Sequence, residues 1–221
     1  MMVVSNSGVG HARQLLTRML PHRLPSRRAL RSLAAMPLAA ILAVLTTGLA
    51  DPTPAAAIEQ PAKYMQRVGK ALLSASRTGS ASDFAGAVRS HSDYASIGLY
   101  SLGSYVKGLP RTDRPTYFTG MINFIAKYAA KESPKYPVAN FVVTGQTEET
   151  RTGAYVDTRV TLRDGTTYDV RWLLVRRGSA YKVRDAQVLG FWMSPFLKDL
   201  FEKYISENGG NPRALVVALN R

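Results

Sequence analysis

The chain has 221 residues, no cysteine and a formal net charge of +14. The lack of cysteine excludes disulfides, thiolate nucleophiles and thiolate metal ligands. Residues 1–50 hold six arginines and no acidic residue, whereas residues 51–221 hold 23 basic and 15 acidic residues, a net charge of +8. That excess does not by itself indicate a nucleic-acid binder. It is typical of a soluble surface, or of one attracted to anionic membranes and partners.

Residues 1–50 are predicted to be a cleaved export signal. A basic region precedes the apolar run 33–49, and small residues between positions 50 and 57 fit a cleavage site. Arg27-Arg28 partly matches a twin-arginine signal, but we favour an ordinary secretory signal. A permanent membrane anchor is disfavoured because the run is short for a bilayer span and contains Pro37. The rest, residues 58–221, is predicted to form a single domain.

Helices are predicted first in this domain. Apolar residues recur at helical spacing from Ile58 to about Ser76, and Ser82 or Asp83 is expected to cap a short helix that ends near Arg89. A further helical segment begins at Tyr94 and is interrupted around Leu102-Gly103. The next helix is expected to start at Asp113 and Pro115 and to stop before Ser133-Pro134, since the residue before proline disfavours helix.

Four strands are predicted next. The first covers Val138 to Thr144, and in the second, from Val156 to Leu162, apolar residues alternate with polar ones, which is typical of a strand with one buried face. Asp164-Gly165 is expected to supply two positive-φ residues to a tight hairpin turn. The third strand places Tyr168, Val170, Trp172 and Leu174 on one face. After a turn at Gly178, the fourth strand begins at Tyr181.

Two helices are predicted at the end of the chain. Ser194-Pro195 is expected to cap the first, which carries a broad apolar face and stops at Asn208-Gly209. Asn211-Pro212 opens the second, which runs to Leu219. Helices, then strands, then helices indicate an α+β fold in which an antiparallel sheet of about four strands packs against N- and C-terminal helices.

Few residues support catalysis or metal binding. His91 is the one histidine after the leader, and its polar surroundings are typical of a surface or capping residue. Spacing alone does not pair the aspartates on or beside the strands, and no glycine-rich phosphate loop is present. We therefore predict a protein that is not an enzyme and that needs no metal and no cofactor.

Basic residues cluster on the outer face or tip of the second predicted hairpin. Such clusters are usually solvated, but this one also suits docking to an acidic partner. The candidate docking residues are Arg171, Arg176, Arg177 and Lys182.

The size of the apolar faces is the positive signal in this sequence. An ordinary closed core explains them, and so does a core that stays open to an apolar ligand. A carrier of that kind would be useful, because each exposed acyl CH₂ costs about 0.8 kcal/mol, or on the order of 10 kcal/mol for a sixteen-carbon chain. Both interpretations remain open on periodicity alone.

The chain resembles the MlaC-type periplasmic phospholipid-shuttle proteins, also called toluene-tolerance auxiliary components of an ABC transporter. Tyr181-Lys182-Val183-Arg184-Asp185, with Val188 and Gly190, resembles one strand of that family, and Val170 to Leu174 resembles the adjacent strand. The remaining similarities are Asp93, Leu102-Gly103, the helix from Tyr117 to Tyr128, Phe201, Ile205, Gly209-Gly210 and Ala214-Leu215.

The resemblance implies a curved sheet packed on helices, with the tails of a phospholipid in an apolar cavity between them. It further implies a periplasmic carrier between an inner-membrane ABC transporter complex and an outer-membrane lipoprotein complex, without hydrolysis and without nucleic acid. The candidate lipid-binding residues are Tyr94, Ile97, Met121, Phe124, Tyr128, Val170, Trp172, Leu174, Val188, Phe196 and Phe201.

One segment departs from the family pattern. Residues 189–193 are Leu-Gly-Phe-Trp-Met, where a more polar segment is typical. A bulkier aromatic opening would suit a hopanoid or another lipid, which is the alternative ligand. Two other hypotheses remain: an enzyme with Asp157 or Asp185 beside His91 or a tyrosine, and a non-catalytic docking module.

Overall fold

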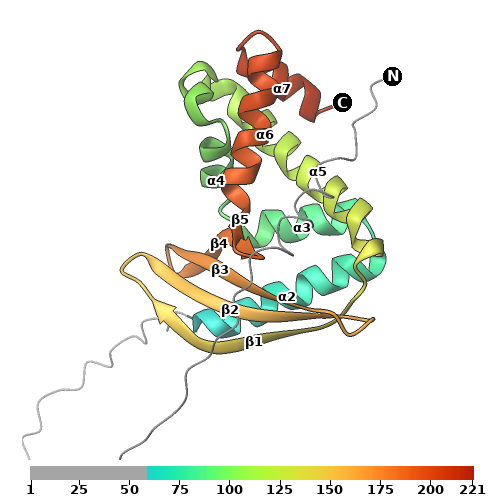
Figure 1. The fold of residues 1–221 in the computed structure, drawn as a ribbon. Helices are drawn as coiled ribbons and strands as arrows, with labels where there is room; N and C mark the ends of the chain where they lie inside the picture. The colour runs from blue at the N-terminus through green and yellow to red at the C-terminus, as the bar shows by residue number, and fades with distance from the viewer. Residues whose placement is uncertain (1–58) are drawn as a thin grey trace, which may run out of the picture. The chain divides into compact units, whose positions relative to one another are not determined.

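The computed structural model describes residues 59–221, without the side chain of Gln146. The predicted export signal lies outside the described residues. Nine helical segments and five strands follow one another in the order expected for an α+β fold (Figure 1). The helical segments are α2 (Pro61–Thr78), α3 (Ala81–His91), α4 (Tyr94–Ser101), η1 (Gly103–Gly108), η2 (Arg111–Asp113), α5 (Arg114–Glu132), η3 (Ser133–Lys135), α6 (Met193–Glu207) and α7 (Pro212–Leu219).

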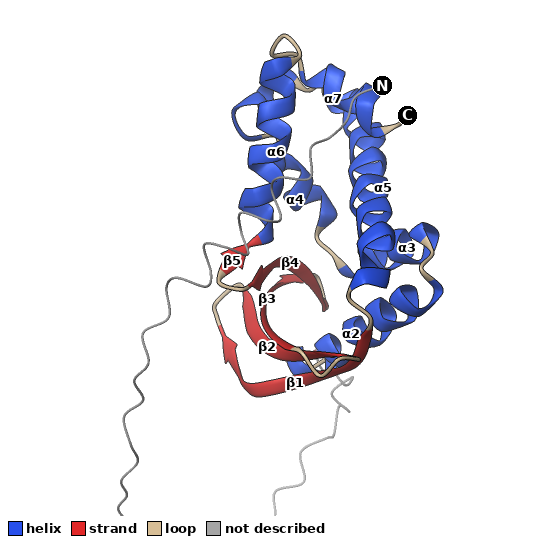
Figure 2. Ribbon diagram, turned by 45° about the vertical axis from the view of Figure 1, so that its right-hand side comes forward, coloured by secondary structure: helices blue, strands red, loops and turns tan. Residues whose placement is uncertain are grey.

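The strands form one antiparallel sheet in the order β1-β2-β3-β4-β5. This meander is curved strongly, as Figure 2 shows. The fifth strand is a two-residue addition to the predicted four. The strands are β1 (Val138–Glu149), β2 (Gly153–Leu162), β3 (Thr167–Arg177), β4 (Ala180–Val188) and β5 (Phe191–Trp192).

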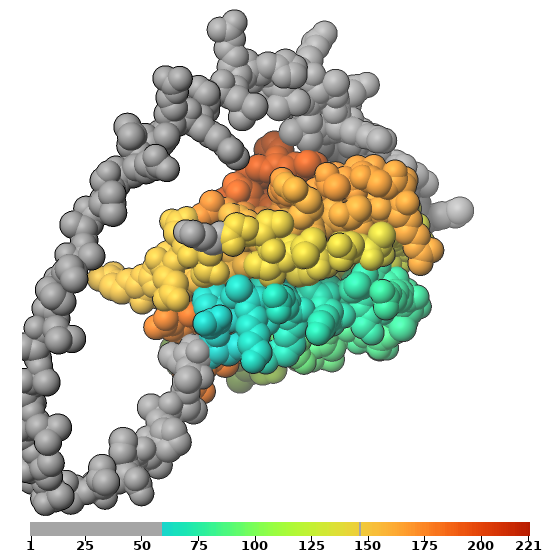
Figure 3. Space-filling model, turned by 90° about the horizontal axis from the view of Figure 1, so that it is seen from below, coloured from blue at the N-terminus to red at the C-terminus, as the bar shows by residue number. Residues whose placement is uncertain are grey.

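Two hydrophobic clusters divide the domain into layers. In one, α2 packs on the sheet through Tyr64, Met65 and Val68, which meet Val156 and Leu174. Figure 3 shows α2 lying against β1. The other cluster joins the helices, and its residues come from α2, α3, α5, α6, α7 and the segment around η1. The sheet is therefore covered by α2, while the helices, including the end of α2, form a second core.

Two helix starts differ from the sequence prediction. The N-cap of α3 is Ser80, whose side chain accepts a hydrogen bond from the Asp83 N–H, rather than Ser82 or Asp83. Helix α6 begins at Met193, and Ser194 is not its cap; instead the Ser194 N–H donates to Asp185 Oδ1 at 2.9 Å. A carboxylate near a helix N-terminus satisfies a free N–H group and opposes the helix dipole. Because Asp185 lies on β4, local sequence does not reveal it as the cap.

The β2–β3 turn also differs from the prediction. Gly165 has φ of 85°, but Asp164 does not have positive φ. The loop between Leu162 and Thr167 has four residues, and the Asp164 carboxylate accepts a hydrogen bond from the Thr166 N–H at 2.9 Å. This side-chain bond replaces the second positive-φ residue that a two-residue turn would need.

Candidate functional site

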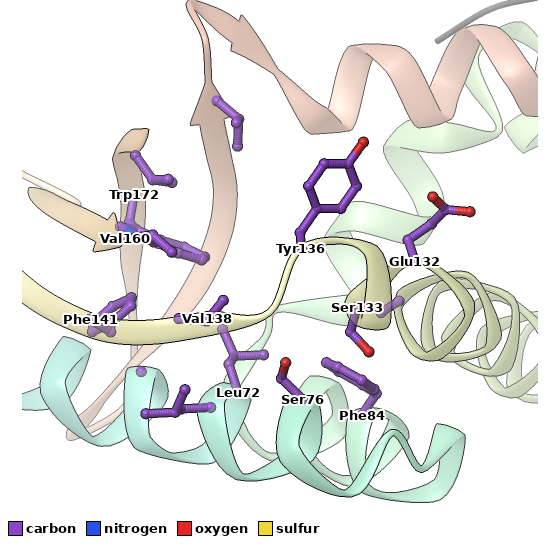
Figure 4. A pocket seen from close by; sticks show the side chains of 15 residues that line it. Leu72, Ser76, Phe84, Glu132, Ser133, Tyr136, Val138, Phe141, Val160 and Trp172 are labelled. Carbon is purple, nitrogen blue, oxygen red and sulfur yellow. The ribbon is translucent and has the colours of Figure 1, made fainter. Parts of the chain in front are cut away.

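An apolar cavity of about 360 Å³ lies between α2, the end of α5 and the sheet face that α2 covers (Figure 4). Its volume falls in the range of roughly 300–1,000 Å³ that is typical of ligand pockets. Its wall is almost entirely apolar. The lining residues are Gly69, Leu72, Leu73, Ser76, Phe84, Ala129, Glu132, Ser133, Tyr136, Val138, Phe141, Val160, Val170, Trp172 and Val188.

Small side chains on the helices help to leave this space open. Gly69 on α2 faces the ring of Phe141 on β1, and a Cβ at Gly69 would lie only 2.2 Å from Phe141 Cε1. The absent side chain lets the ring pack directly on the helix backbone. Ser76 and Ala129 likewise fill little of the volume between α2 and α5. The small residues Gly69, Ser76 and Ala129 thus lie among the larger apolar side chains that the helices and the sheet both contribute to the wall.

Most of the few polar side chains around the cavity lie on one side of it. Ser76, Glu132, Ser133 and Tyr136 gather at one side in Figure 4, opposite Trp172 and other apolar residues of the sheet. Glu132 is paired with Lys135 Nζ at 2.9 Å, and its carboxylate is therefore already compensated. An elongated molecule with one polar end would match this asymmetry.

The polar atoms of the sheet wall are satisfied within the protein. Trp172 Nε1 donates to Thr158 Oγ1 at 2.8 Å, and that hydroxyl donates to the Val170 carbonyl at 3.3 Å. Thr158 is fully buried. A ligand against this wall meets carbon surface, so its affinity would come from burial of apolar area and from dispersion.

The structure brings three of the predicted lipid-binding residues together in the cavity wall: Val170, Trp172 and Val188. Leu174 lies fully buried in the cluster between α2 and the sheet. Tyr128 and Phe196 are exposed. The other predicted residues pack in the helical cluster away from this wall; they are Tyr94, Ile97, Met121, Phe124 and Phe201.

Sequence reasoning missed the contributions of α2 and β1 to the wall. Leu72 follows Val68 at helical spacing, and Phe141 alternates with Val143, so both periodicities were readable. The predicted set nevertheless drew on neither element. The missing information was which helix covers the sheet.

Comparison with known proteins decides the family. The MlaC protein family matches residues 63–221, well over half of the chain. The chain belongs to the MlaC family. A search among curated proteins finds no match.

A solved structure supports the α+β fold. It is a phospholipid-binding protein from Ralstonia solanacearum in complex with a phospholipid, with 18% sequence identity to this MlaC-family chain. The match covers 73% of this chain and 96% of the other, with a TM-score of 0.56. At this identity the comparison establishes a shared fold.

The four candidate docking residues of this MlaC-family chain all make internal contacts. Arg171 pairs with Glu148 and stacks over the Tyr155 ring, and Arg176 Nε donates to the Tyr181 hydroxyl at 3.2 Å. The other two reach the helices. Arg177 Nη2 lies 2.5 Å from Asp93 Oδ2, and Lys182 Nζ lies 2.5 Å from the Ser90 carbonyl oxygen.

The histidine and the two aspartates considered from the sequence as acid–base residues do not line the cavity, although one tyrosine, Tyr136, does. His91 contacts the Tyr64 ring edge-on, and burial, followed by the charges of Arg67 and Lys182, lowers its pKa. Asp185 binds the start of α6, and Asp157 lies opposite Arg171 in the β2–β3 register. Within residues 59–221, no group of three or more His, Asp or Glu side chains is arranged to hold a metal ion. Over the same residues, no helix combines the length and apolarity needed to cross a membrane.

Proposed function

We propose that this MlaC-family chain is a non-catalytic lipid carrier that encloses phospholipid acyl chains in the cavity between α2 and the sheet. The observation that carries the proposal is the apolar wall built from Phe141, Val170, Trp172 and Val188. Enclosing a sixteen-carbon chain removes a hydration penalty on the order of 10 kcal/mol. The bound phospholipid of the Ralstonia solanacearum structure supports the same ligand class.

The orientation of the lipid follows from the two ends of the cavity. Acyl chains would contact Trp172 and Val188, and the head group would lie toward Ser133 and Tyr136, which carry hydroxyl groups. Tyr136 is exposed, so this end communicates with solvent. A head group at this exposed end would keep its hydration.

The route of the carrier is the second part of the proposal. We place the protein in the periplasm, where it carries phospholipid between an inner-membrane ABC transporter complex and an outer-membrane lipoprotein complex. Family membership and the predicted export signal in residues 1–50 support this placement. Arg171 and Arg176 stay half exposed on the sheet and remain candidates for docking to these partners.

Native mass spectrometry of the protein from a periplasmic extract tests carriage, followed by organic extraction of the ligand. We expect an adduct of lipid mass that yields a phospholipid. Val160→Trp, which fills the cavity from β2, is expected to lose the adduct. Val142→Trp is the matched control, because Val142 is exposed on neighbouring β1 and does not line the cavity.

The other outcomes discriminate the alternatives. A polycyclic triterpenoid in the extract would retain the carrier and replace phospholipid as its ligand. A lipid-free mass that does not change after incubation with phospholipid vesicles would reject carriage. Thermal denaturation of both tryptophan variants shows whether each is still folded, so that loss of the lipid adduct is not confused with unfolding.

A further inference from the structure

A continuous series of exposed apolar side chains runs from the end of β4, through β5, onto α6. Leu189, Phe191 and Phe196 are 51%, 60% and 68% exposed, and Met193 and Leu200 are also exposed. We call these five residues the apolar strip. Single exposed apolar residues are ordinary, but a contiguous group of large ones marks an interaction surface.

The strip is not the core-facing side of α6. That side is formed by Ser194, Phe201 and Ile205, which are buried against the neighbouring helices and sheet. Met193, Phe196 and Leu200 are separated by three and four residues, so they share the outward side of the helix. Helix α6 is therefore apolar on two sides, and only one of them has a partner in the described part of the chain.

Backbone conformation gives a second indication of function at Leu189. Leu189 has φ of 53°, and among residues 59–221 it is the one non-glycine residue with positive φ. Leu189 and Gly190 form the two-residue loop between Val188 and Phe191, in which asparagine followed by glycine is the favoured pair. Leucine is strained in this conformation and places an apolar side chain in water. A residue that is unfavourable on both counts indicates a role outside the fold.

The strip adjoins the cavity. Val188 lines the cavity wall and pairs with Phe191 across the β4–β5 turn, and Leu189 follows it directly. Figure 1 shows β5 between β4 and the start of α6. The exposed side chains thus begin one residue beyond the lipid-facing surface of the sheet.

We propose that the apolar strip inserts into the surface of an anionic lipid bilayer. The side chains project from a turn and a helix, as in interfacial segments that bury Phe and Leu at the head-group boundary. Residues 59–221 carry 23 basic and 14 acidic side chains, so the domain is attracted to an anionic surface. On α6 itself, Lys198 pairs with Glu202 and Lys203 with Glu207, and Asp199 is exposed, so the attraction comes from the net charge of the domain and not from this helix.

Vesicle flotation tests this proposal, with the protein in the form in which it is isolated from a periplasmic extract. The vesicles are phosphatidylethanolamine and phosphatidylglycerol at three to one, compared with pure phosphatidylcholine. Wild-type protein is expected to float with the anionic vesicles and to do so less as salt is raised. Phe191→Ser combined with Phe196→Gln is expected to lower the partition coefficient at least about tenfold, given the apolar area removed. Val142→Asn and Val217→Asn remove exposed apolar residues outside the strip and should float as wild type does.

Leu189→Asn separates a binding role from a structural one. Asparagine tolerates the positive φ, so this variant is expected to melt at a higher temperature than wild type while it binds the vesicles more weakly. If Leu189 had only a structural role, the melting temperature and the vesicle binding would change in the same direction.

Three outcomes would overturn the proposal. The first is no flotation of wild type with anionic vesicles, and the second is equal flotation of the strip variants. The third is a wild-type dimer that these variants dissociate, because the strip would then join two copies of the chain. Native mass spectra of the same samples keep the result separate from carriage. Lipid-free protein that floats through the strip supports bilayer binding even where the carrier proposal fails.

Discussion

Arg177 lies at the end of β3, and Asp93 lies just before α4. Arg177 Nη2 donates a hydrogen bond to Asp93 Oδ2 over 2.5 Å. Asp93 also donates its own N–H to the Val183 carbonyl at 2.8 Å, so this one residue joins the β3–β4 hairpin to the helices through two contacts. Burial raises the pKa of the Asp93 carboxyl, but hydrogen bonds from Arg177 and Ser96 and the nearby guanidinium charges outweigh it and lower the pKa below its usual value. The ion pair is thus a structural connection between the two layers.

Replacing Arg177 with leucine is expected to destabilise the protein by about 1–2 kcal/mol. We expect a free energy in the low part of the range for a charge-assisted hydrogen bond. Asp93 is buried, but the guanidinium of Arg177 is half exposed, and solvent weakens the interaction. Arg159→Leu is the matched control. Its partner Asp169 is exposed, so we expect a change below about 0.5 kcal/mol. Urea denaturation measures both, and equal losses would contradict the structural role of Asp93.

This contact affects how a docking experiment must be designed. Substituting Arg176 and Arg177 together with glutamate would place a carboxylate next to Asp93, and lost partner capture would then include lost stability. Arg171→Gln with Arg176→Gln leaves the Arg177–Asp93 pair intact. Both residues also make internal contacts, so the melting temperature of the variant is measured alongside. Reduced capture at a temperature where the variant remains folded is the result expected if the sheet arginines dock a partner.

Glu202 should make stability depend on pH in the acid range. Lys198 at 2.5 Å, together with the N–H and hydroxyl of Ser104, lowers the pKa of Glu202 from 4.5 to about 2. Because the folded-state pKa is the lower one, this contribution is complete above pH 4.5 and is lost as the pH falls from about 4.5 to about 2. Glu202→Gln should flatten the free energy of unfolding over that window. Glu207→Gln, which removes a carboxylate 3.8 Å from Lys203, should keep the wild-type slope.

Much of the fold was readable from local sequence. Helix α5 starts after Asp113 and ends before Ser133, as the aspartate–proline start and the later proline predicted. Alternation from Val156 to Leu162 correctly gave a strand with one buried face. In each case the sequence pattern that predicts the element lies within a few residues along the chain. The Asp185 cap of α6 is supplied from another element, and local sequence placed the cap wrongly at Ser194.

The candidate site was less predictable than the fold. Periodicity identifies the apolar face of an element, but it does not say whether that face meets a core, a cavity or solvent. Phe124 and Trp172 were equally strong candidates, yet Phe124 packs on Phe201 with ring centroids 5.8 Å apart, whereas Trp172 lines the cavity. Phe196 lies on an apolar helix face and is exposed. These differences depend on long-range packing.

Alanine substitutions at Gly69 and Gly86 should have opposite effects. Both residues lie within helices, where replacing glycine by alanine ordinarily adds roughly 0.5–1 kcal/mol of stability. A Cβ at Gly86 would meet nothing within 4 Å, so we expect that gain. At Gly69 it would lie 2.2 Å from the Phe141 ring, and displacement of the ring should cost about 1–3 kcal/mol. Urea denaturation of the two variants is the measurement, and a gain at both sites would mean that Phe141 moves freely.

The two tryptophans allow the bound lipid to be located. Trp172 lines the cavity, whereas Trp192 packs near Tyr155, with ring centroids 6.3 Å apart, and is not in the cavity wall. Trp192→Phe keeps Trp172 as its one tryptophan, and Trp172→Phe keeps Trp192. After exchange with a phospholipid brominated in its acyl chains and removal of the vesicles, fluorescence should fall strongly in Trp192→Phe and little in Trp172→Phe. A melting curve must accompany the second variant, because it also loses the hydrogen bond to Thr158. Equal quenching of both would contradict a lipid confined to the cavity, because Trp192 does not line it.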